Sequence, residues 1–371
     1  MIKKLLLIAL LLSGCSFAAT AESKQSKKEV QIADHQDSSH ASVQWCYHYQ
    51  QLDEEQKQNY QRLYEGIASH EEEIILENAD ENDAKQLYHS VLDDHPQLFY
   101  VQSQFKYGIY ANHTLHFYPA YDYDEQESSR IMAEIDESCE QILAAAPSGS
   151  SDEEMAAYLY QYVIEHAEYE SNERDQQMDS FFLQGKSVCA GYSKAYQYLM
   201  EKAGIPCTTL SGHLLAATGS GQNKDSSHAW NMIKMEDDWF YVDATSGDVV
   251  QYGPHSCYQF FLMSSQEIEQ LYQSSVPLME TKDPSQSYFR KNDLYLRHYD
   301  EDTVQNAIDR MKKNGEKVLE LRTEPFATQQ LKEELLSDNR IFELLRKNEI
   351  AVEQLGCAQL DELGSIEFYY N

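Results

Sequence analysis

Residues 185–204 read GKSVCAGYSKAYQYLMEKAG, and this stretch decides the fold of the middle of the chain. After Cys189, apolar side chains recur at helical spacing, for example at Tyr192 and Leu199, and Gly204 marks the end of the helix. Cys189 is therefore predicted to lie in the first helical turn, where unpaired N–H groups and the helix dipole favour a thiolate. A small apolar cysteine packed at a helix start fits the same stretch, so this segment alone leaves both interpretations open.

An acidic turn joins two further segments that predict the strands of a hairpin: residues 228–233 (HAWNMI) and 239–244 (WFYVDA). A four-residue loop pairs Lys234 with Trp239, and this register places His228 and Asp243 on the same face as diagonal neighbours. A three-residue loop would put the two side chains on opposite faces. We predict the four-residue loop.

Thiol, imidazole and carboxylate groups in this chain order are the parts of a nucleophilic thiol enzyme. Cys189 would attack an acyl carbon as a thiolate. His228 would take the thiol proton as a base and later give it to the leaving amine as an acid. Asp243 would orient the imidazole and stabilise its charged form.

The oxyanion of such a reaction needs hydrogen-bond donors. The backbone N–H of Cys189 is the first candidate, and the side chains of Gln184 and Tyr192 are two others, although Tyr192 also fits a role in core packing. Trp230 is expected to form a wall of the site. The sequence has no C-x-x-C pair and no H-E-x-x-H helix, so neither a metal ion nor another cofactor is expected.

The first residues predict an exported protein that is anchored by lipid. Residues 1–14 combine a pair of lysines with a short apolar run, as a signal peptide does. Residues 12–15 (LSGC) resemble a bacterial lipobox, so the mature chain is expected to begin at a lipidated Cys15 on the extracellular face of the cell membrane. The alternative is an ordinary signal peptide cleaved near Ala19. The polar residues 15–44 are expected to form a flexible stalk, and the lipid is the only expected contact with the membrane.

Charge and composition narrow the classes of function. The chain has 29 Lys and Arg against 62 Asp and Glu, a net charge of −33, so it should repel nucleic acid. Hydrophobic residues make up 42% of the chain, which is enough for sizeable cores. A polar boundary near residue 150 and the element patterns predict three folded parts: an N-terminal α/β accessory domain over 45–150, a catalytic domain over 151–285 and a C-terminal α/β accessory domain over 286–371.

The chain has seven cysteines. If Cys15 carries lipid and Cys189 is catalytic, five others remain, and the sequence leaves their pairing open: Cys46, Cys139, Cys207, Cys257 and Cys357. A disulfide between Cys189 and Cys207 would favour an inert site, because catalysis requires a reduced Cys189. The sequence does not indicate the oligomeric state.

These segments closely resemble the transglutaminase-like superfamily, a group related to papain that has Cys, His and Asp in this order. The resemblance covers roughly residues 151–265 and rests on four pieces: 185–192, 203–206 (AGIP), 228–231 (HAWN) and 239–245 (WFYVDAT). It implies an α+β fold in which a helix carrying Cys189 packs against an antiparallel sheet carrying His228 and Asp243. The wider arrangement is similar to exported transglutaminase-domain proteins of Gram-positive bacteria. No calcium-site signature of the animal cross-linking enzymes is evident.

The expected function is a cell-surface thiol acyl-transfer enzyme that acts on amide bonds of an extracellular protein or a cell-wall peptide. Hydrolysis is favoured over transfer to an amine, because water is always present and no dedicated amine site is evident. The alternative from another class is a surface binding or adhesion module that uses the same fold without chemistry. The substrate does not follow from the sequence.

Overall fold

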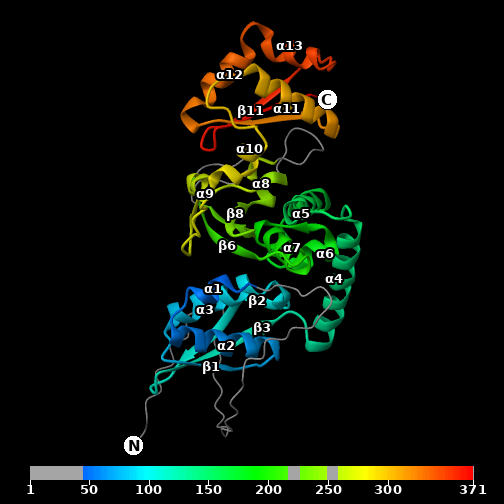
Figure 1. Cartoon of the computed structure of the whole chain (residues 1–371). Coiled ribbons are helices and arrows are strands. Elements are labelled where there is room, and N and C mark those ends of the chain that lie inside the picture. The colour runs from blue at the N-terminus through cyan, green and yellow to red at the C-terminus, as the bar shows by residue number, and fades with distance from the viewer. Residues whose placement is uncertain (1–44, 216–225, 249–257, 371) are drawn as a thin grey trace, which may run out of the picture. The chain divides into compact units, whose positions relative to one another are not determined.

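The computed structural model describes residues 45–215, 226–248 and 258–370 (Figure 1). The predicted signal peptide, Cys15 and all of the predicted stalk therefore lie outside the described residues, as does Cys257. The chain divides into two compact units, Met1–Glu137 and Ser138–Asn371. The second unit contains both the predicted catalytic domain and the predicted C-terminal domain.

The described part of the first unit combines helices with one small sheet. Its three-stranded sheet has the order β1-β3-β2, and both neighbouring pairs are antiparallel. The elements are α1 (Tyr47–Gln50), α2 (Glu54–Ala68), β1 (Ile74–Glu77), α3 (Glu81–Asp94), β2 (Val101–Ile109), β3 (Thr114–Tyr121) and α4 (Glu125–Ala145), the last of which continues into the second unit.

From the sequence we predict that Asn82 or Asp83 caps a helix reaching Leu92, and this prediction is wrong by two or three residues. The N-cap is Asp80, whose carboxylate accepts the backbone N–H groups of Asn82 and Asp83. Asp83 in turn accepts the backbone N–H of Asp80, which completes a capping box.

The middle of the chain forms a four-stranded antiparallel sheet in the order β8-β7-β6-β9, with α7 packed against β7 and β6 (Figure 1). Its strands are β6 (Cys207–Leu214), β7 (Ser227–Met235), β8 (Asp238–Val242) and β9 (Tyr272–Ser274). Its helices are α5 (Asp152–His166), α6 (Met178–Gln184), α7 (Cys189–Lys202), α8 (Ala244–Asp248), α9 (Ser265–Leu271) and α10 (Tyr288–Lys291), and a short parallel pair joins β4 (Glu168–Tyr169) to β5 (Lys186–Ser187). The architecture is therefore a mixture of helix and antiparallel sheet.

The hairpin register is the predicted one. Lys234 pairs with Trp239, as the four-residue loop requires. The turn is nevertheless tighter than predicted, because Met235 pairs with Asp238 and extends the ladder by one rung. Only two residues then remain in the turn, of which Glu236 takes a positive φ of 52°. Adding a pair at the end of a ladder does not change which side chains share a face, so His228 and Asp243 keep the predicted relation.

The last part of the chain folds around its own hydrophobic core, which is built from α11 (Glu301–Asn314), α12 (Thr328–Leu336), α13 (Arg340–Lys347) and one face of a sheet. The sheet has the order β10-β12-β11, from β10 (Val318–Arg322), β11 (Gly356–Leu360) and β12 (Ser365–Tyr369). α12 and α13 are separated at Asp338 and Asn339, where positive φ values of 53° and 58° break the helical path.

A buried ion pair links this last part to the sheet that carries the hairpin. Arg322, at the end of β10, donates to the carboxylate of Glu267 on α9 at 2.8 Å. Its guanidinium also donates to the backbone and side-chain oxygens of Gln259 and lies over the Phe289 ring. The Arg322 side chain is only 1% exposed, so the pair is shielded from water. α9 leads directly into β9, and Arg322 therefore braces the segment that enters the sheet.

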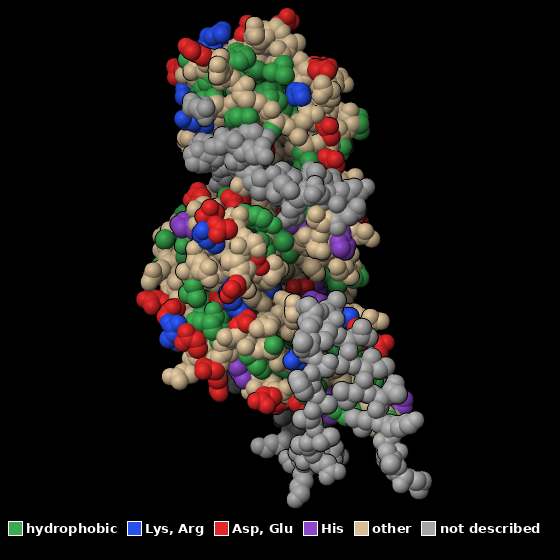
Figure 2. All heavy atoms as spheres, turned by 180° about the vertical axis from the view of Figure 1, so that it is seen from behind, with side chains coloured by type: hydrophobic (Ala, Val, Ile, Leu, Met, Phe, Trp, Pro, Cys, Tyr) green, Lys and Arg blue, Asp and Glu red, His purple; other side chains and the backbone are tan. Residues whose placement is uncertain are grey.

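Acidic side chains are spread over the described surface in Figure 2, in keeping with the net charge of −33. Within the described residues, no helix is both long and apolar enough to cross a membrane.

Candidate active site

His228 and Asp243 meet inside the second unit. His228 lies on β7, and Asp243 follows the last residue of β8. Nε2 of His228 is 2.7 Å from Oδ2 of Asp243, and both side chains are fully buried. Two predicted members of the triad are thus brought together by the hairpin register, as the sequence indicated.

Two further residues hold the Asp243 carboxylate. The hydroxyl of Tyr272 donates to Oδ2 at 2.5 Å, and the backbone N–H of Ser246 donates to Oδ1 at 2.9 Å. Burial by itself raises the pKa of Asp243, but the charge of His228 and these hydrogen bonds outweigh burial and lower it. Asp243 is therefore ionised at neutral pH, which is the state that can stabilise an imidazolium.

The His228 ring is held as a cation. Burial by itself lowers the pKa of His228, but the charge and hydrogen bond of Asp243 and the thiol of Cys189 raise it to about 10. Because Nε2 of His228 is hydrogen-bonded to Asp243, Nδ1 is the ring nitrogen that could interact with the Cys189 thiol. Nδ1 forms no hydrogen bond of normal length among the described residues, so the contact with Cys189 is loose. Catalytic hydrogen bonds are often long in unliganded enzymes and shorten when substrate binds.

Cys189 is the first residue of α7, with Val188 as the N-cap, so it occupies the predicted position. The first amide groups of an α-helix have no partner within the helix, so their partial positive charge lies beside Cys189. Gly191 is required here, because a Cβ at this position would lie 1.8 Å from Oγ of Ser187. The thiols of Cys189 and Cys207 are both free, so no disulfide between them blocks the nucleophile.

Trp230 lies against the triad but is completely buried. Its ring centroid is 4.7 Å from that of Tyr272 and 6.2 Å from that of His228. Trp230 therefore supports the triad from inside the sheet. Trp230 is the residue predicted to form a wall of the site, and it lies beside His228 with its side chain fully buried.

The two predicted side-chain donors for an oxyanion differ in their surroundings. Gln184 is exposed at the C-terminal end of α6. Tyr192 is buried, and its hydroxyl donates to Oδ2 of Asp248 at 2.6 Å. Because that proton is engaged by Asp248, the structure gives the donor role of Tyr192 no support. The backbone N–H of Cys189 remains the donor best placed at the nucleophile.

Sequence reasoning missed Tyr272 and Ser246. Tyr272 is the first residue of β9, a strand of three residues that is too short to show alternation. It reaches the site because β9 pairs with β6, and this pairing joins segments far apart in the sequence. Ser246 acts through its backbone, so its side-chain type gave no signal.

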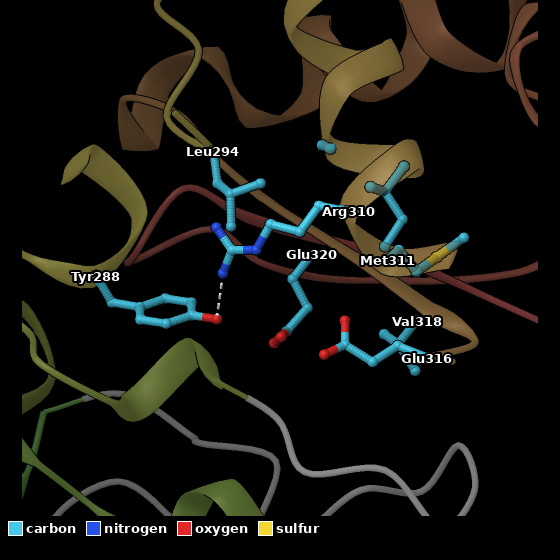
Figure 3. Close-up of a pocket in the computed structure, with 9 residues that line it drawn as sticks. Tyr288, Leu294, Arg310, Met311, Glu316, Val318 and Glu320 are labelled. Carbon is cyan, nitrogen blue, oxygen red and sulfur yellow. Dashed lines mark hydrogen bonds between the residues drawn. The ribbon is translucent and has the colours of Figure 1, made fainter. Parts of the chain in front are cut away.

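A recess in the C-terminal part of the second unit is lined by other residues than Cys189, His228 and Asp243. Arg310 donates to the hydroxyl of Tyr288 at 2.8 Å, with Glu316 and Glu320 nearby (Figure 3). None of its lining residues is a cysteine or a histidine, so the recess offers no nucleophile and no general base of that kind. Among the residues that the structure describes, no group of three or more His, Cys, Asp or Glu side chains could hold a metal ion.

Comparison with known proteins gives the same picture of the middle of the chain. Residues 141–244 match the sequence model of the Transglutaminase-like superfamily. The Kyphoscoliosis peptidase of Mus musculus is 28% identical over 106 residues, and that of Homo sapiens is 27% identical over 131 residues. These alignments cover 26% and 32% of this chain, but only 16% and 19% of the relatives.

Among solved structures, similarity is found to a crystal structure of a TGase, with 15% identity and a TM-score of 0.28 over 48% of this chain and 50% of that one. The periplasmic domain of TgpA from Pseudomonas aeruginosa is 16% identical, with a TM-score of 0.23 over 40% of this chain and 66% of that one. The matched residues include Cys189, His228 and Asp243, so the part of the chain that carries these three residues is similar to the Transglutaminase-like superfamily.

Proposed function

We propose that this protein is a thiol acyl-transfer enzyme of transglutaminase-like type, which breaks or exchanges amide bonds through Cys189, His228 and Asp243. The observation that carries the proposal is the fully buried pair of His228 and Asp243 at 2.7 Å, beside a free thiol at the start of a helix. Burying two ionisable groups is costly, and such pairs are common where a fold sustains catalysis.

The proposed reaction begins with the Cys189 proton on His228. The Cys189 thiolate attacks the carbonyl carbon of an amide, and the backbone N–H of Cys189 stabilises the oxyanion. The C–N bond then breaks, His228 gives its proton to the leaving amine, and a thioester remains on Cys189. Throughout, Asp243 stays ionised and holds the ring.

The second half of the reaction needs His228 as a base. Once Cys189 is acylated, its thiolate no longer stabilises the imidazolium, so the pKa of His228 falls and the ring can accept a proton. His228 takes that proton from water or from an amine as either attacks the thioester, and the thiolate leaves. We propose hydrolysis as the usual outcome, because water needs no binding site of its own.

We also propose that the enzyme works on the outer face of the cell membrane, anchored by lipid on Cys15, with an extracellular protein or a cell-wall peptide as substrate. This proposal is supported by the sequence pattern of residues 1–15 alone, because these residues lie outside the described structure.

The experiment is mass spectrometry of a peptide library incubated with the protein, with and without an added primary amine. Wild type is compared with Cys189→Ala. We expect hydrolysis to give two products whose masses sum to that of the peptide plus water, and transfer to give an acyl product that carries the added amine in place of the leaving amine. The Cys189→Ala variant should give neither product. Full activity in Cys189→Ala would refute the proposal, and no reaction with the wild type across the library would favour the binding module.

A further inference from the structure

Tyr272 shares one oxygen of Asp243 with His228. Its hydroxyl donates to Oδ2 at 2.5 Å, and Nε2 of His228 lies 2.7 Å from the same atom. The hydroxyl of Ser246 lies 3.2 Å from that of Tyr272 and forms a second contact. The phenol is therefore part of a continuous hydrogen-bonded chain that ends at the imidazole.

The ring of Tyr272 is also held in place, by burial and by two neighbouring rings. Tyr272 is only 2% exposed, and its ring centroid lies 5.2 Å from that of His228 and 4.7 Å from that of Trp230. Gly212 makes room for this arrangement, because a Cβ there would lie 2.0 Å from the backbone oxygen of Gln273 and 2.9 Å from the Trp230 ring. The phenol cannot turn away from Asp243 without disturbing the sheet.

A phenylalanine would fill the same space and pack on the same rings. The hydroxyl therefore adds something beyond packing, and its described partners are Asp243 and Ser246. Because Tyr272 and His228 both donate to Oδ2, the phenol fixes the rotamer of the carboxylate and limits how much negative charge faces the imidazole.

We propose that Tyr272 is a positioning residue of the active site, which acts through Asp243 to hold His228 in its catalytic orientation. The inference rests on the proposed function. Within the described residues, the titratable groups that act on or contact His228 are Asp243, Cys189 and Tyr272.

The test compares Tyr272→Phe with Tyr196→Phe in the full chain. Tyr196 is a matched control, because it is also fully buried and its hydroxyl donates to the backbone oxygen of Ala156 at 3.1 Å, away from the triad. The first readout is the proton NMR resonance of Nε2–H of His228. We expect it to move downfield in Tyr272→Phe, because Oδ2 then serves one donor, and to stay in place in Tyr196→Phe.

The second readout is steady-state kinetics with a peptide substrate found in the library. We expect kcat to fall about tenfold in Tyr272→Phe, the effect of one hydrogen bond, with KM unchanged. Equal resonances and equal kcat values in the two variants would overturn the proposal. If the wild type has no activity, the proposed function fails, whereas the NMR comparison still decides whether Tyr272 sets the hydrogen bond between Asp243 and His228.

Discussion

Replacing Asp243 by Asn should change how the stability of the protein depends on pH. The carboxylate is the main group that keeps His228 protonated in the fold, because burial by itself favours the neutral ring. Without this charge, His228 should be neutral in the folded protein throughout the alkaline range. The variant should therefore lose the stability that the wild type gains from a charged His228.

The size of the effect follows from the pKa of His228, which rises from 6.5 to about 10 in the fold. This difference is about 3.5 units, and at ~1.4 kcal/mol per unit it corresponds to about 5 kcal/mol. A group with a raised pKa contributes its full stability below its unfolded pKa and loses it as the pH rises through its folded pKa. The contribution should thus be complete below pH 6.5 and should disappear by about pH 10.

The measurement is urea unfolding of wild type and Asp243→Asn at several pH values between these limits, followed by tryptophan fluorescence. Two of the three tryptophans, Trp230 and Trp239, lie on β7 and β8, so the signal reports on this sheet. We expect the wild type to be more stable at the low end, with a gap that narrows as the pH rises. Asp248→Asn is the control, because Asp248 is a half-buried carboxylate whose hydrogen bond goes to Tyr192 and not to His228. A gap between wild type and Asp243→Asn that stays constant with pH would refute the reasoning.

Two further predictions concern the buried ion pair of Arg322 and Glu267 and the proposed lipid anchor on Cys15. Arg322→Met should destabilise the second unit by about 3–5 kcal/mol in urea unfolding, because it leaves Glu267 buried without its counter-charge. Lys312→Met, in an exposed ion pair, should cost less than about 1 kcal/mol, and equal losses in the two variants would contradict this view. Cys15→Ser should abolish incorporation of a labelled fatty acid and release the protein from membranes in cell fractionation, and a variant that stays labelled would remove the proposed anchor.

The sequence predicted the parts of the site that depend on local pattern. Helical spacing after Cys189 and the acidic turn before Trp239 were enough to place the nucleophile and to set the register. The loop has two residues instead of the predicted four, but the strands pair in the predicted register. His228 and Asp243 therefore lie on the same face, as predicted. Helix starts and interruptions were less predictable, because Asp80 competed with nearby residues of similar capping ability.

The parts that could not be predicted depend on contacts between distant segments. Tyr272 reaches Asp243 only because the three residues of β9 pair with β6, and nothing in so short a strand indicates its partner. The ion pair of Arg322 and Glu267 is a similar case, since either residue alone reads as an ordinary surface charge. The sequence allowed the Tyr192 hydroxyl to be a donor to the oxyanion, because it gave no sign that this hydroxyl donates to Asp248.

The brace from Arg322 has a consequence for the order in which the site is completed during synthesis. Cys189, His228 and Asp243 all leave the ribosome before Arg322, because it follows them in the chain. α9, which leads into Tyr272, gains the counter-charge for Glu267 only when β10 has formed. A nascent chain would therefore carry the Cys189 thiol before the segment that holds Asp243 and His228 is braced, and the proposed site would be completed only after β10 has been synthesised.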